Sequence, residues 1–131
     1  MSTNNLLNLT TSTSAVWGGL KDDPDAPGFA VRGALPGDPD GVELMLEGWQ
    51  AGMEEATHSH PGDDMTIVVE GCMHVQFYTR SEMQLVADGE VLVLNKGDVG
   101  YIKANRIHSA KYIEDCKLVY VHNGVFGFNE E

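Results

Sequence analysis

A chain of 131 residues, 42% of them hydrophobic and 21% charged, is long enough for one domain with its own core and has the composition of an ordinary globular protein. Its 20 acidic residues outnumber the 8 Lys and Arg and give a net charge of -12 at pH 7, which argues against nucleic acids and membrane surfaces as partners because both are anionic. No apolar run approaches the roughly 18 residues of a membrane helix, and the N-terminus lacks the features of a secretory signal, so we expect a cytoplasmic protein.

The first 41 residues predict an N-terminal arm and one short strand. Residues 1–20 are rich in Ser, Thr and Asn, and we interpret them as an arm that docks through Trp17. Residues 21–41 contain four of the five prolines, together with Asp-Pro and Pro-Gly steps that are typical of turns. Only residues 29–33 have the pattern of a strand in this region.

The rest of the chain alternates short runs of β-forming residues with turn residues, and no stretch has a helical period. Strands at this spacing predict an all-β sandwich or barrel, in one domain that spans 1–131. Asp88-Gly89 lies between two such runs and predicts a two-residue hairpin, because both positions of that turn need a positive φ. The expected strands are 42–50, 55–60, 65–70, 73–79, 83–87, 90–94, 99–102, 107–113 and 117–123.

His58 and His60 are the first candidates for a functional site. They are two positions apart in an expected strand, so their side chains share a face with Cα atoms roughly 6–7 Å apart. That separation suits two ligands of one metal ion.

The stretch around these histidines resembles the first motif of the cupin superfamily. That motif consists of Gly, five residues, His-x-His, three or four residues, Glu, six residues and Gly. Gly52, His58, His60 and Gly71 match it, and Asp64 stands in the place of the glutamate.

A second stretch resembles the second cupin motif, which consists of Gly, five residues, Pro-x-Gly, two residues, His, three residues and Asn. Gly97 and His108 match it in register. Lys103, Asn105 and Tyr112 stand where the family has Pro, Gly and Asn. Asn105 is a mild departure, because Asn tolerates the left-handed conformation better than most residues.

The resemblance implies a double-stranded β-helix, or jelly-roll, barrel with residues 42–123 as its core, and a homodimer. It also implies one divalent metal ion per chain, held by His58, His60, Asp64 and His108. Fe(II) and Mn(II) are favoured, and Ni(II) and Zn(II) also suit imidazole and carboxylate ligands. Asp64 is one methylene shorter than Glu, so direct coordination, coordination through water and a site of three histidines all stay open.

The alternation of side chains along strands predicts the walls of the pocket beside this metal. If Asp64 and His108 point inward, then so do Thr66, Val68, Ala110 and Tyr112. The resulting surface is mostly apolar with two hydroxyls, which suits a small organic substrate. Candidates for acid–base or supporting roles beside the metal are Tyr112, Tyr120 and His122.

Two classes of function remain open. The first is a metal-dependent enzyme that polarises an oxygen of a small organic substrate. A dioxygenase is slightly favoured over an isomerase or lyase, because three histidines with a weak or absent carboxylate resemble the iron sites of some cupin dioxygenases. The second is a non-catalytic binding or sensing module that uses the same pocket.

Overall fold

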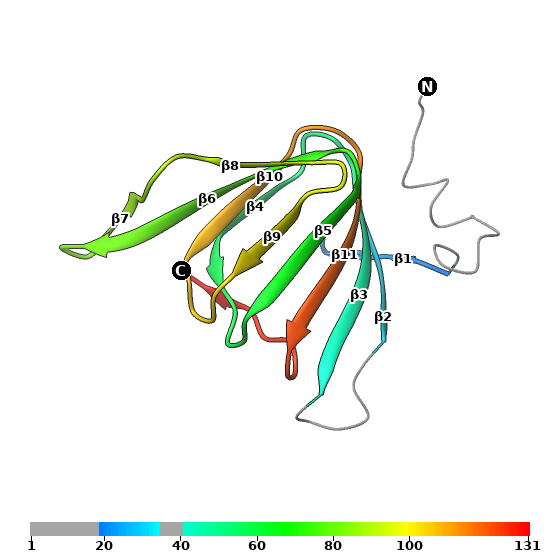
Figure 1. Ribbon diagram of the computed structural model, residues 1–131, viewed down its shortest axis with the longest axis horizontal. Coiled ribbons are helices and arrows are strands. Elements are labelled where there is room, and N and C mark those ends of the chain that lie inside the picture. The colour runs from blue at the N-terminus through cyan, green and yellow to red at the C-terminus, as the bar shows by residue number, and fades with distance from the viewer. Residues whose placement is uncertain (1–18, 35–40) are drawn as a thin grey trace.

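The computed structural model describes residues 19–34 and 41–131, and every regular element within these ranges is a β-strand (Figure 1). The arm with Trp17 lies outside the described residues. Within the described part of the chain, no helix is long and apolar enough to cross a membrane. The strands are β1 (Lys21–Asp22), β2 (Phe29–Ala34), β3 (Val42–Trp49), β4 (Glu54–Ser59), β5 (Asp64–Glu70), β6 (Cys72–Ser81), β7 (Gln84–Ala87), β8 (Leu92–Asn95), β9 (Val99–Ile102), β10 (His108–Tyr112), β11 (Cys116–Asn123) and β12 (Asn129–Glu130).

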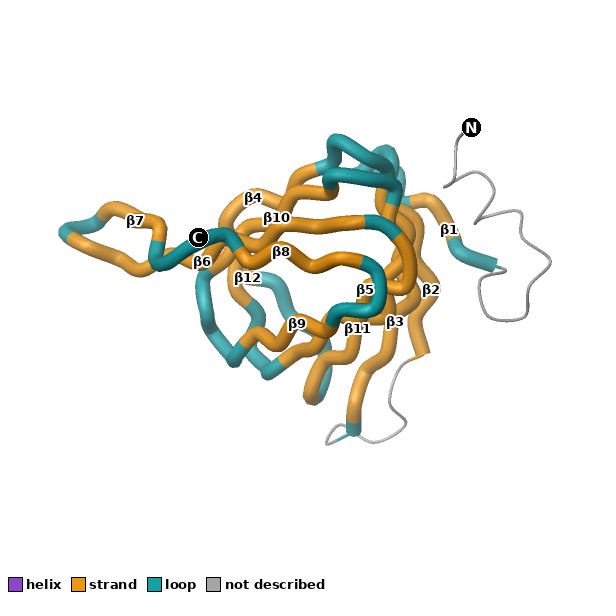
Figure 2. The backbone as a smooth tube through the Cα atoms, turned by 45° about the horizontal axis from the view of Figure 1, so that its top comes forward, coloured by secondary structure: helices purple, strands orange, loops and turns teal. Residues whose placement is uncertain are grey.

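The strands form two antiparallel sheets (Figure 2). The first has the order β1-β2-β3-β11-β5-β9, and the second has the order β12-β4-β10-β6-β7, with β8 also paired to β6. From β3 to β6 and from β8 to β11, consecutive strands alternate between the two sheets. The resulting orders, β3-β11-β5-β9 and β4-β10-β6-β8, are those of a jelly roll, so the expected fold class is confirmed.

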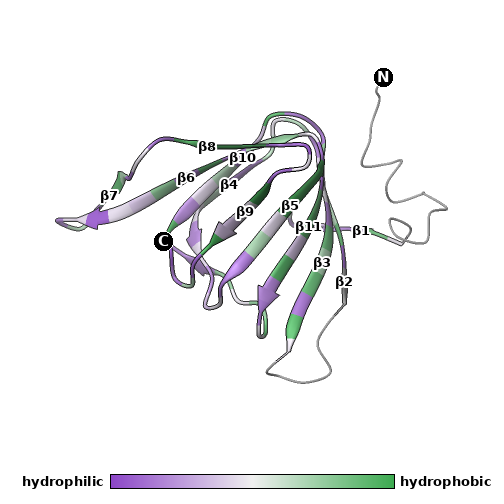
Figure 3. Cartoon of the chain, in the orientation of Figure 1, coloured by the Kyte–Doolittle hydropathy of each residue, from purple (hydrophilic) through white to green (hydrophobic). Residues whose placement is uncertain are grey.

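The main hydrophobic core lies between the two sheets. Val68 and Leu118 enter it from the first sheet, and Val75 and Ala110 enter it from the second. Trp49 of β3 stacks on Tyr112 of β10 with ring centroids 4.2 Å apart, which joins the sheets at one end of the core. Figure 3 shows hydrophobic residues along the strands of the barrel and hydrophilic residues at the far end of β6.

The expected hairpin at Asp88-Gly89 is wrong. The two flanking runs, β7 and β8, do not pair with each other, because both pair with the ten-residue strand β6. The tight turn lies instead at Glu82 and Met83, between β6 and β7, where both residues have positive φ, 49° and 69°. This hairpin extends away from the barrel at the left of Figure 1, and Met83 at its tip is 97% exposed.

A β-bulge in β4 changes which of its side chains face the interior. His108 of β10 lies opposite His58, but Ala110, two residues later, lies opposite Glu55, three residues earlier. An extra residue in one strand re-aims the side chains beyond it. Simple alternation would place Ala56 on the face of His58, whereas the bulge leaves Ala56 exposed and turns Glu55 toward the interior.

Candidate metal centre

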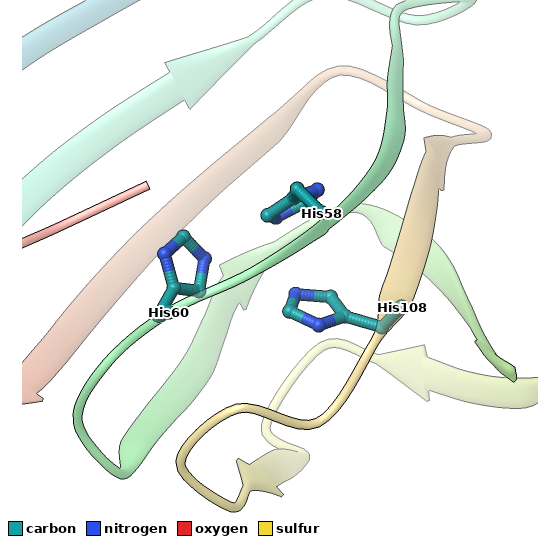
Figure 4. Close-up of side chains that lie close together, drawn as sticks. All are labelled: His58, His60 and His108. Atoms are coloured by element: carbon teal, nitrogen blue, oxygen red, sulfur yellow. The ribbon is translucent and has the colours of Figure 1, made fainter. Parts of the chain in front are cut away.

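Three histidines converge on one space inside the barrel. His58 and His60 come from β4 and its C-terminal end, and His108 comes from the start of the neighbouring strand β10 (Figure 4). All three are buried, and one ring nitrogen of each lies within 4.8 Å of those of the others. These residues could therefore hold a metal ion.

Backbone carbonyls fix the orientation of all three rings. Nδ1 of His58 donates to the carbonyl of Ala56, Nδ1 of His60 donates to that of Gly127, and Nδ1 of His108 donates to that of Arg106, at 2.7, 2.7 and 2.8 Å. A carbonyl oxygen can only accept, so each Nδ1 carries the proton and each Nε2 keeps a free lone pair. Hydrogen bonds of this kind orient the imidazole ligands of metal sites.

Burial also favours the neutral form of the three histidines, which is the form that binds metals. Desolvation lowers the pKa of His58 and His60 below the usual value. It lowers the pKa of His108 to about 4. The lone pairs are therefore available at neutral pH. A donor set of three imidazoles with nearby carboxylates fits a divalent transition metal ion and would leave coordination positions for another molecule.

Asp64 is buried at the start of β5, with 2% exposure. Its Oδ2 accepts a 2.9 Å hydrogen bond from the hydroxyl of Tyr120, and its Oδ1 has no partner among the described residues. Burial raises the pKa of Asp64 to about 6. The carboxylate does not join the three histidine nitrogens within their common 4.8 Å limit.

Two further carboxylates, neither of them predicted from the sequence, face the same interior. Glu55 Oε2 lies 3.9 Å from Nε2 of His58, and Glu55 Oε1 accepts a 2.6 Å hydrogen bond from Tyr112. Glu47 on β3 accepts a 2.9 Å hydrogen bond from Nε1 of Trp49. Only Glu47 could have been predicted to face the interior, because it shares a strand face with the large apolar residue Trp49. Nothing in the sequence marks the bulge that turns Glu55 inward.

The histidines and carboxylates line a cavity of about 640 Å³ inside the barrel. Of the residues expected in its wall or beside the metal, Thr66, Ala110, Tyr112 and Tyr120 line it. Val68 does not line it, because its side chain is fully buried in the core beneath. Burial, together with nearby carboxylates, raises the pKa of both tyrosines, so each stays protonated and donates a hydrogen bond.

His122 lies beside the cavity wall and is fully buried. It is the cross-strand partner of Asp64, and its Nδ1 lies 3.3 Å from the carbonyl of Gly124. Its Nε2 has no partner among the described residues. The structure thus brings His122 close to the site without placing it in contact with the cavity.

The segment after β11 covers part of this site. Its last strand, β12, pairs with β4, and the ring of Phe128 stacks on His58 with centroids 4.6 Å apart. The side chain of Glu131 accepts hydrogen bonds from Ser59 and Arg80. Neither β12 nor the contact of Gly127 with His60 was predicted from the sequence.

No protein-family model matches the sequence, and no curated protein matches it. Solved structures do match. KdgF from Halomonas sp. is 20% identical over 79% of this chain and 87% of its own, with a TM-score of 0.61. A cupin superfamily protein from Desulfitobacterium hafniense is 18% identical over 72% of this chain and 78% of its own, with a TM-score of 0.56.

The chain has the cupin fold. A salicylate 1,2-dioxygenase from Pseudaminobacter salicylatoxidans is also similar, with 22% identity, a TM-score of 0.60 and 75% of this chain covered. The match spans only 27% of that dioxygenase chain. At these identities the structural similarity shows the fold alone, and the reaction has to be inferred from the site itself.

Proposed function

We propose that this cupin is a metal-dependent enzyme in which His58, His60 and His108 hold one divalent ion and the cavity binds a small organic substrate. The observation that carries the proposal is the convergence of three lone-pair nitrogens on one space, with all three Nδ1 donors already used. Fe(II) and Mn(II) are the favoured ions, and Ni(II) and Zn(II) suit the same ligands. When bound, the ion supplies a Lewis acid that polarises a substrate oxygen.

The side chains around the histidines have separate proposed roles. Asp64 is the proposed fourth ligand, directly or through water, and Tyr120 positions its carboxylate. Tyr112 positions Glu55 in the same way. Thr66 and Ala110 bound the substrate space. For His122, the cross-strand partner of Asp64, we propose an acid–base or supporting role beside the metal.

A dioxygenase reaction is favoured over an isomerase or lyase reaction. Three neutral imidazoles leave room for both a substrate and dioxygen on one ion. The structural similarity to a salicylate 1,2-dioxygenase, whose structures include one with gentisate, supports this choice.

Metal analysis and oxygen uptake test the proposal together. We expect about one metal ion per chain in protein purified without added metal, and oxygen consumption with phenols, diketones or thiols. Metal without oxygen uptake, but with turnover of a test substrate, would favour the isomerase or lyase reading. Metal-free protein that still binds small molecules in the cavity would favour the non-catalytic binding module.

We also propose a homodimer, which the outer face of the first sheet supports. Leu44, Val121, Met65 and Tyr101 form one row across β3, β11, β5 and β9. Three of the four, Leu44, Met65 and Tyr101, are exposed large hydrophobic residues. Sedimentation velocity tests this proposal, and a mass of one chain at micromolar concentration would refute it.

A further inference from the structure

The charges that line the cavity all have the same sign. The chain has eight Lys and Arg. All eight fall within the described ranges 19–34 and 41–131, and none of them lines the cavity. Six acidic residues do line it: Asp23, Asp25, Glu47, Glu55, Asp64 and Glu130.

Three of these carboxylates lie deep in the cavity, and each accepts a hydrogen bond from a neutral donor. Tyr112 donates to Glu55, Trp49 donates to Glu47, and Tyr120 donates to Asp64. Because the three histidines are held neutral, a divalent ion would balance two of the three negative charges. The third carboxylate would carry a charge only with a further cation beside it, because an unpaired charge in a buried site is costly.

Asp64 and Glu47 both lack a positively charged partner in the described part of the chain. The proposed metal ion would serve Asp64, while Glu47 lies outside the proposed ligand set. Asp64 Oδ1 is buried in the cavity wall without a partner in the described part of the chain, and its residue is 2% exposed. Burial, followed by the nearby carboxylate of Glu55, raises the pKa of Glu47 to about 8. A cation in the cavity would relieve this repulsion and favour the ionised form.

The outer part of the cavity is also acidic and so favours cations. Asp25 and Glu130 line it and are exposed, so they lie where it opens to solvent. Acidic residues at an opening attract cations and repel anions before binding. Phe126 and Phe128 add aromatic faces, which interact favourably with organic ammonium groups.

We propose that the substrate or ligand of this cavity is a small organic ammonium ion, whose positive charge is bound by Glu47 and its neighbouring carboxylates. This inference rests on the proposed function only in taking the cavity as the substrate site. An organic carboxylate or phosphate would instead add negative charge to a cavity without a cationic side chain. A neutral molecule would leave Glu47 without a positively charged partner.

Three probes of nearly the same shape separate these cases: benzylammonium, benzyl alcohol and benzoate. Their binding is measured by calorimetry on the purified protein, whose metal content is determined on the same sample. We expect benzylammonium to bind tightest and benzoate weakest. Glu47→Gln should weaken benzylammonium binding about tenfold, the loss typical of one buried charge-assisted hydrogen bond, and leave benzyl alcohol binding unchanged. Glu54→Gln is the matched control, because the Glu54 side chain is 66% exposed and lies outside the cavity.

The ranking of the three probes on the unaltered protein decides the proposal without any variant. Equal or tighter binding of benzoate, equal binding of benzyl alcohol, or no benzylammonium binding at millimolar concentration would each overturn it. Equal effects of Glu47→Gln and Glu54→Gln would also overturn it, by assigning the preference to general surface charge. If the protein contains no metal but prefers the cation, the proposed metal enzyme fails while this inference stands. If it contains metal and prefers benzoate, the proposed metal site stands while this inference fails.

Discussion

Oε2 of Glu55 lies 3.9 Å from Nε2 of His58, although strict alternation along β4 would turn these two side chains to opposite faces. The bulge between them removes that separation. Carboxylates therefore approach the histidines from both sheets, Glu55 from β4 and Asp64 from β5. Any test of the metal centre has to separate the contributions of these two groups.

Loss of one histidine should abolish metal binding. We expect His58→Ala or His108→Ala to reduce the metal content from about one ion per chain to near zero. Two imidazoles bind a divalent ion poorly, and the nearby carboxylates lie outside the common 4.8 Å distance of the histidine nitrogens. His74→Ala is the control, since His74 lies on β6 outside the cavity lining. Plasma emission spectroscopy gives the metal content, and full occupancy in both site variants would refute the assignment.

The Asp64 carboxylate should matter less than a histidine. We expect Asp64→Asn to weaken metal binding by about tenfold, as is typical of groups that support a metal site. Tyr120→Phe, which removes the hydroxyl that holds Oδ2, should have a smaller effect in the same direction. Competition with a chelator measures both affinities. An unchanged affinity in Asp64→Asn would leave a site of three histidines, and the same measurement on Glu55→Gln would show whether Glu55 replaces it.

Glu47 should make the metal-free protein less stable as the pH rises above neutrality. The pKa of Glu47 in the folded protein is about 8, above its usual 4.5, so the folded chain holds a proton that the unfolded chain has released. Between these two values, folding stability falls with pH by at most about 1.4 kcal/mol per pH unit, the value for one proton. Above pH 8 both states are ionised and this contribution to the pH dependence ends.

Thermal unfolding between pH 7 and 8.5 measures this decline. Glu47→Gln should flatten it, because its side-chain oxygen can still accept the hydrogen bond from Trp49 without titrating. The difference between the curves of the unaltered protein and Glu47→Gln isolates Glu47, because the three site histidines, whose pKa values are lowered from 6.5, contribute equally to both proteins. The same decline in Glu47→Gln would show that another group is responsible.

The turn between β6 and β7 should be easy to stabilise. Glu82 and Met83 both adopt positive φ, which costs a non-glycine residue roughly 1–2 kcal/mol. Replacing them with Asn and Gly, the residues this turn prefers, should raise the free energy of unfolding by about 1 kcal/mol. Gly89→Ala is the opposite change, because Gly89 has a φ of 79°, and it should destabilise by a similar amount. Urea denaturation measures both, and an unchanged midpoint in the first variant would contradict the expectation.

The parts of this protein that follow local rules could be predicted from the sequence. Alternating runs predicted the strands, the spacing of His58 and His60 predicted a pair of metal ligands, and the resemblance to the second cupin motif added His108. The hairpin was misplaced because Asp88-Gly89 is a stronger local signal than Glu82-Met83, while the length of β6 decides the pairing. Glu55 was missed because a bulge depends on the register between two strands, which one strand alone does not encode.

The carbonyl of Gly127 ties His60 to a segment 67 residues later in the chain. Ion binding at His60 and docking of this segment are therefore thermodynamically linked. Any interaction that stabilises the docked segment raises the affinity of His60 for an ion, and ion binding stabilises the docked segment by the same free energy. Gly127 has no room for a side chain, since an added Cβ would lie 2.7 Å from Cγ of Pro61, so even a methyl group there would disturb this link. The backbone amides of β12 should therefore exchange their hydrogens more slowly once the ion is bound. Hydrogen exchange in β12 would then report ion binding, although β12 contains none of the proposed ligands.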